Sequence, residues 1–182
     1  MKANKAIFGT ATLLAMTATA WAGRATTSAT ASSPGYGPGT AAATAGYDGN
    51  GVGITRTNAR TGRVNIAQGV SLGFDENGLS LSTSYAIAPR FGPAIGSTMN
   101  VAIGTDGSVA HSVGRTLATG SRTRTVSTAG SAAPGSRGRS PTASAAASGR
   151  TGHGGKVISK THSRTRVSKA HRRVIRKRAW RR

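Results

Sequence analysis

Apolar side chains recur at every second position through the middle of the chain, between residues 46 and 119. The clearest runs are Val64 and Ile66, then Val70, Leu72 and Phe74, and then Leu79, Leu81, Tyr85 and Ile87. This is the period of a β-strand that buries one face. Asn77-Gly78 and Asp106-Gly107 stand between such runs and favour the positive φ angles of tight hairpin turns. The pattern predicts a mostly β region of antiparallel hairpins, as a meander or small sandwich, with its aliphatic face inward.

The alternate positions of the same strands carry small side chains, such as Ser71 and Ala86. Lys, Glu and Arg, which discourage edge pairing, are largely missing there. We therefore expect a flat surface that another sheet, a helix or a polymer can approach closely. The equal spacing of Asp48-Gly49, Asn77-Gly78 and Asp106-Gly107 favours a repeated hairpin unit. Since few large apolar side chains are available for burial, self-association is a further way to complete this fold.

The segments on either side of this region, residues 23–45 and 120–149, consist largely of Ala, Thr, Ser, Gly and Pro. Such segments have little to bury and do not recover the entropy lost on ordering. We expect them to be disordered linkers on either side of the β region.

Residues 1–22 have the three parts of a signal peptide: Lys2 and Lys5, an apolar run, and the closing sequence Ala20-Trp21-Ala22. The small side chains at its end predict cleavage between Ala22 and Gly23. The apolar run is short and diluted by threonines, which argues against a retained membrane anchor. We expect an exported protein, either secreted, periplasmic or bound to the cell surface.

Charge is distributed unevenly along the chain. There are 25 Lys and Arg residues against 4 Asp and Glu, for a net charge of +21, which attracts polyanions. Every acid lies within residues 46–119, so residues 150–182 form an acid-free basic tail. We expect this tail to be disordered when free and to form a short helix on an anionic surface. The candidate polyanion-binding residues are Lys156, Lys160, Arg164, Arg166, Lys169, Arg172, Arg173, Arg176, Lys177, Arg178, Arg181 and Arg182.

Catalytic and metal-binding patterns are weak. Without cysteine there is no disulfide and no thiolate chemistry. The turns that begin at Asp48 and Asp75 resemble the start of a calcium loop, but Ala59 and Ala86 stand where a bidentate Glu is needed. The histidines lack the close paired spacing of structural zinc sites, and no Gly-x-Ser-x-Gly elbow precedes a helix. We therefore predict no enzymatic activity, no cofactor, no metal and no small-molecule substrate.

These observations favour an exported or cell-envelope protein whose β region is anchored by its basic tail. The expected partner is an anionic surface: lipopolysaccharide, phospholipid or an envelope polymer. An extracellular nucleic-acid-binding protein is the first alternative, because Lys and Arg neutralise nucleic-acid phosphates in the same way. An oligomeric fibre or pore component is the second, because of the alternating strands and the small-residue face.

Overall fold

The computed structural model describes residues 23–120, 122–135, 139–152 and 154–168. Over these residues the chain forms antiparallel strands in two sheets and no helix, which confirms the mostly β prediction. The strands are β1 (Arg24–Ser33), β2 (Thr40–Asp48), β3 (Val52–Arg60), β4 (Val64–Asp75), β5 (Gly78–Pro89), β6 (Ala94–Gly104), β7 (Val109–Thr119), β8 (Arg124–Ala133), β9 (Thr142–Thr151) and β10 (Lys156–Arg166). Nowhere in these described ranges does a helix have the length and apolar character needed to cross a bilayer.

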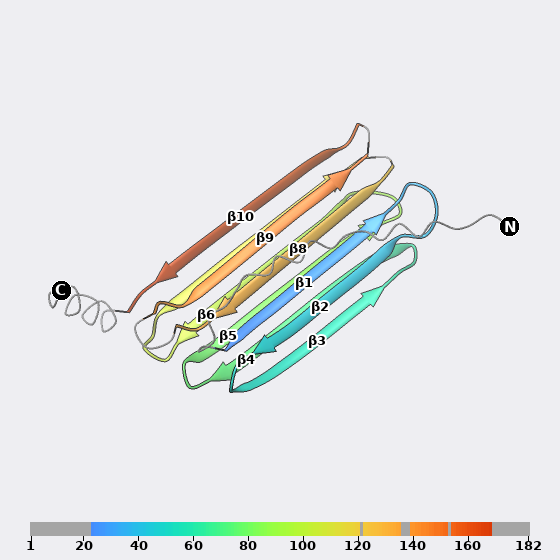
Figure 1. Cartoon of the computed structure of the whole chain (residues 1–182). Helices are drawn as coiled ribbons and strands as arrows, with labels where there is room; N and C mark the ends of the chain where they lie inside the picture. Colours follow the sequence, from blue (N-terminus) through green and yellow to red (C-terminus); the bar gives the residue numbers. More distant parts are fainter. Residues whose placement is uncertain (1–22, 121, 136–138, 153, 169–182) are drawn as a thin grey trace.

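The two sheets pack face to face, and the strand axes of the two layers are nearly aligned, although neighbouring strands are antiparallel (Figure 1). One sheet has the order β2-β1-β8-β9, and the other has the order β10-β7-β6-β5-β4-β3. Consecutive strands β3 to β7 form the meander expected for the middle of the chain. The chain changes sheet after β2, after β7 and after β9, so that β8 pairs with β1 and β10 pairs with β7.

Two of the predicted turn sequences close hairpins within this meander. Gly78 and Gly107 both have positive φ, at 138° and 77°. In each turn an aspartate side chain accepts a hydrogen bond from the backbone N–H of the residue two positions later. Asn77 N donates to Asp75 Oδ1 at 2.8 Å, and Ser108 N donates to Asp106 Oδ1 at 2.9 Å. The third sequence, Asp48-Gly49, instead lies where the chain crosses to the other sheet. The equally spaced glycines therefore mark two hairpins and one crossing, and the threefold repeat is not formed.

The two low-complexity segments form strands, which differs from the disordered linkers expected at residues 23–45 and 120–149. Together they supply β1 and β8, and most of β2 and β9, which make up the four-stranded sheet. Inward positions such as Ala29 and Ala31 are buried, while the outward Thr30 hydroxyl lies 3.0 Å from that of Ser127. Ala and Gly lose almost no side-chain entropy on burial. Once the backbone hydrogen bonds of the sheet form, the burial of small side chains is therefore enough to keep these strands ordered. These segments complete the sandwich that the meander needs.

The small-residue face forms the interior of the sandwich, so the prediction of an inward aliphatic face is wrong. Close approach of the second sheet explains this result. At Gly69 of β4, an added Cβ would lie 2.5 Å from the carbonyl oxygen of Thr44 in the opposite sheet. The expectation that another sheet can approach this face closely is confirmed. The buried hydrophobic residues are Ala25, Ala29, Ala31, Ala67, Ala86, Ala88, Ala94, Ala102, Ala110, Ala118, Val126 and Ala132.

Polar groups in this interior bond to one another across the two sheets. The Thr27 hydroxyl lies 2.8 Å from that of Ser82, which donates to Asn100 Oδ1 at 2.6 Å. Asn100 Nδ2 in turn donates to the Ser112 hydroxyl at 3.1 Å and to the Ser144 carbonyl at 2.8 Å. Buried polar groups are tolerated when they are hydrogen-bonded in this way. The network therefore helps to fix how the two sheets align.

The basic segment 150–182, expected to be disordered, is ordered in its first part. Residues 156–166 form β10, which pairs along its length with β7 as an edge strand. The backbone ladder gives this segment partners that an isolated, self-repelling tail does not have. Residues 169–182, which include most of the predicted short helix, lie outside the described residues.

Candidate anion-binding face

The outward face of the six-stranded sheet carries most of the large apolar side chains of the described residues. Ile54 on β3 and Phe74 on β4 are 64% and 62% exposed, and Ile95 and Met99 on β6 are also exposed. The four-stranded sheet packs on the opposite, small-residue face, so within the described residues no second layer covers the aliphatic one. A contiguous apolar surface of this kind is typical of a binding site.

The strand register arranges this face in rows that run across the sheet, because directly paired residues of neighbouring strands share a face. One apolar row consists of Ile158, Leu117, Ile95, Ile87 and Ile66. A second apolar row consists of Val101, Leu81, Leu72 and Ile54. A polar row lies between them and consists of Lys160, Arg115, Ser97, Tyr85, Gln68 and Asn58. The apolar field is therefore divided by a row that begins with two cations.

Cations gather at the β7–β10 edge of this face. Lys160 directly faces Arg115, and Arg164 lies further along β10. Like charges that face each other on a sheet repel and destabilise it. An anion bound beside Lys160 and Arg115 would reduce this repulsion. No carboxylate lies among these outward residues of β7 and β10. The acids of the chain lie at strand ends or turns instead: Asp48, Asp75, Glu76 and Asp106.

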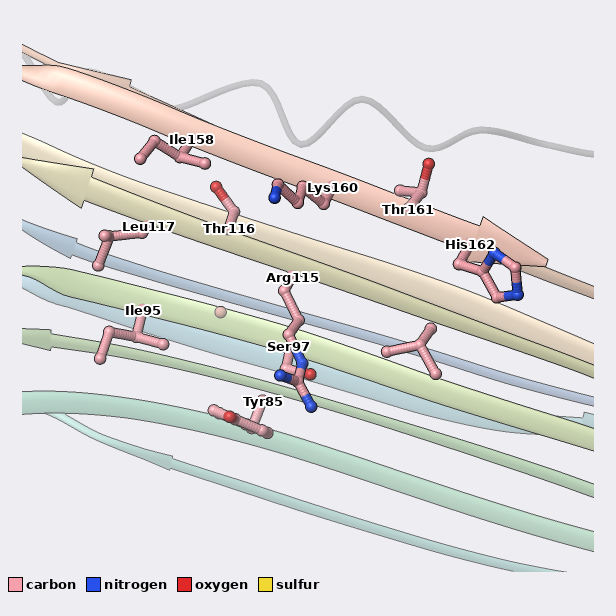
Figure 2. A pocket seen from close by; sticks show the side chains of 12 residues that line it. Tyr85, Ile95, Ser97, Arg115, Thr116, Leu117, Ile158, Lys160, Thr161 and His162 are labelled. Atoms are coloured by element: carbon pink, nitrogen blue, oxygen red, sulfur yellow. The ribbon is translucent and has the colours of Figure 1, made fainter.

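A shallow groove of about 680 Å³ follows the polar row over β5, β6, β7 and β10. Figure 2 shows Tyr85, Ser97 and Arg115 on successive strands, with Lys160 on the next. Ser97 is short, which leaves the hollow between its larger neighbours. Apolar walls come from Ile95, Leu117 and Ile158 on one side and from Val113 on the other. The groove thus combines apolar walls with a polar floor that carries two cations at one end.

Other chemistry is not assembled on this face. The His111 and His162 rings lie 6.1 Å apart, but no group of three potential metal ligands occurs in the described part of the chain. The pattern Gly69-Val70-Ser71-Leu72-Gly73 lies within β4, where Ser71 is buried and its hydroxyl donates to the Gly46 carbonyl at 2.6 Å. This serine is therefore not displayed on a strand-to-helix turn.

The predicted polyanion-binding residues fall into two groups. Lys156, Lys160, Arg164 and Arg166 lie on β10, and all four are exposed on the outward face. The remaining candidates, from Lys169 to Arg182, lie outside the described residues. Sequence reasoning missed Arg115 and the aliphatic rows beside it, although Arg115 shares the alternation of His111 and Val113 along β7. That alternation places Arg115 on the outward face of β7. Only the pairing of β10 with β7 brings it next to the cations of β10.

Comparisons of this chain with protein-family models, curated proteins and solved structures found no match. A functional interpretation therefore rests on the geometry of this face.

Proposed function

We propose that this is an exported, non-enzymatic envelope protein that binds anionic lipid surfaces through the outward face of its six-stranded sheet. The carrying observation is the acid-free cation cluster of β7 and β10 beside exposed aliphatic rows. Anionic headgroups attract Lys and Arg, and aliphatic side chains gain free energy when an acyl region covers them. The net charge supports the same partner: without Lys2 and Lys5 of the signal peptide, 23 − 4 gives +19, which draws the protein toward any anionic surface.

The chemistry of the face favours lipid over the other partners. Nucleic-acid grooves stack bases on aromatic rings, whereas the two apolar rows of this face are aliphatic apart from the neighbouring Tyr85 and Phe74. Self-association through the β10 edge is disfavoured, because Lys and Arg on an edge strand discourage pairing with another sheet. Nucleic acid binding and fibre formation are therefore kept as outcomes that the experiment below distinguishes.

The test compares two doubly substituted proteins with equal net charge. Arg115→Gln/Lys160→Gln removes the facing cations of the groove, and Arg122→Gln/Arg150→Gln removes two exposed cations elsewhere. Each cation near an anionic bilayer contributes about 1 kcal/mol, so the groove variant should bind vesicles about 30-fold more weakly. The control variant should lose far less. Co-sedimentation with phosphatidylglycerol vesicles over a salt series, with phosphatidylcholine vesicles for comparison, measures this.

Equal losses in the two variants would show that binding depends on net charge alone and would overturn the assignment to this face. Binding to duplex DNA that exceeds vesicle binding at the same salt would favour the nucleic-acid alternative. Concentration-dependent, salt-resistant oligomers without vesicle binding would favour the fibre.

A further inference from the structure

Asp75, the last residue of β4, places a buried carboxylate beside the start of β1. The backbone N–H of Gly23 donates a hydrogen bond to Oδ2 of Asp75, whose side chain is only 9% exposed. The other carboxylate oxygen, Oδ1, accepts from the backbone nitrogens of Asn77 at 2.8 Å and Gly78 at 3.1 Å. Gly23 itself is buried. The Gly23 nitrogen is therefore held inside the fold against one oxygen of an acid.

The space around this nitrogen fits glycine alone. A Cβ on residue 23 would lie 2.1 Å from the hydroxyl of Tyr47 and 2.6 Å from Asp75 Oδ2. The Tyr47 hydroxyl is buried beside this nitrogen. Desolvation and the nearby Asp75 charge both raise the pKa of Tyr47. The pocket thus contains a hydrogen-bonded carboxylate and, close to it, a buried hydroxyl oxygen.

We propose that cleavage between Ala22 and Gly23 produces a new N-terminus whose α-ammonium forms an ion pair with Asp75 in this pocket. A signal peptidase would hydrolyse the peptide bond: water supplies the hydroxyl to the Ala22 carboxyl group and a proton to the Gly23 nitrogen. The free amine binds a further proton near neutral pH. An ammonium has three N–H donors where the peptide nitrogen has one, so it can reach the Tyr47 hydroxyl oxygen as well as Asp75.

Two independent lines meet at residue 23. The signal-peptide pattern predicts the cleavage position from residues 1–22, and the pocket selects the same residue through its size and charge. Cleavage would place a positive charge on the donor of a bond whose acceptor is already a carboxylate, which adds the attraction between two opposite charges to the hydrogen bond. Removal of the signal peptide would thereby fix the start of β1, an inner strand that pairs with both β2 and β8. This inference does not depend on the lipid-binding proposal.

The first experiment is the intact mass and N-terminal sequence of the exported protein recovered from cells. We expect the chain to begin at Gly23, and a different N-terminus would overturn the proposal. The second compares urea unfolding of that chain with a chain extended by one residue, Ala22. We expect the extension to lower the folding equilibrium constant about tenfold, because the Gly23 nitrogen becomes a neutral peptide N–H and the charge moves to the nitrogen of Ala22. Equal stability of the two chains would also overturn the proposal.

Two variants show whether Asp75 is the partner. Asp75→Asn should abolish the stability difference between the two chains, whereas Asp106→Asn, which alters the equivalent cap of the β6–β7 turn, should preserve it. A difference that persists undiminished in Asp75→Asn would contradict the ion pair. If Asp75→Asn does not fold, the Gly23 chain with an acetylated N-terminus gives the same test, because acetylation removes the charge and keeps an N–H donor. This acetylated chain should be less stable than the free Gly23 chain, and equal stability of these two chains would count against the proposal.

Discussion

The small-residue interior can be tested with adjacent residues of one strand. Ala102 of β6 is fully buried between the sheets, against Ala110, Ala132 and Ala143. Its neighbour Ile103 points outward and is 41% exposed. We expect Ala102→Leu to destabilise the protein more than Ile103→Thr, which is the reverse of what hydrophobicity alone predicts.

The magnitudes follow from burial. Full burial of an isoleucine side chain contributes at most about 3 kcal/mol, and only part of Ile103 is buried, so Ile103→Thr should cost about 1.5 kcal/mol or less. Leucine at residue 102 adds three carbons where the sheets already touch, and overpacking should cost about 3 kcal/mol. Ala146, exposed on β9, gives the matched control: Ala146→Leu should cost under about 0.5 kcal/mol.

Urea unfolding followed by far-ultraviolet circular dichroism gives the free energy of unfolding of each variant. Since strand content supplies the signal, all variants are read with the same probe. A larger loss for Ile103→Thr than for Ala102→Leu would refute the small-residue interior and place the aliphatic face inside.

Three further results are expected. Asn100→Ala should lower the free energy of unfolding by about 3 kcal/mol, because it removes the buried hydrogen bonds of Asn100 to Ser82, Ser112 and the Ser144 carbonyl; the same urea assay measures it. Lys160→Gln should raise stability without ligand by about 0.5 kcal/mol, because it removes the repulsion with Arg115, while vesicle binding weakens; an unchanged urea midpoint would count against repulsion between this pair. The pKa of Tyr47 is raised from 10.0 in the fold, so the neutral side chain stabilises the protein below pH 10.0, and this contribution is lost as the pH rises through the folded pKa. Tyr47→Phe should therefore show a smaller alkaline loss of stability than the unsubstituted protein when urea midpoints are compared across that range.

Local signals predicted the strands of the meander and two of its turns. The alternation from Val64 to Ile87 and the glycines at residues 78 and 107 specify structure through neighbouring residues alone. The direction of each face was not predictable in the same way. It depends on whether a second sheet is available, and that sheet comes from segments whose composition indicates disorder. Ala29 and Ala31 contribute little individually, and their burial becomes favourable only when β4 and β5 lie opposite them.

The candidate face was partly predictable for a related reason. The cations of β10 are evident from composition, as is their lack of acidic neighbours. Their alignment with Arg115 and with the apolar rows depends on the pairing of β10 with β7, which joins residues far apart in the chain. A period of two is visible along β10 only once residues 156–166 are known to be extended.

The pairing of β1 with β8 sets the order in which the sandwich can close. Ala25 pairs with Ala132, so the central ladder of the four-stranded sheet joins strands separated by the whole meander. Contacts between distant parts of a chain form slowly, because a long loop must close before they are gained. During synthesis from the N-terminus, one edge of β1 has no strand partner until residues 124–133 emerge. The four-stranded sheet is therefore completed late, after the whole six-stranded meander except β10 has been made.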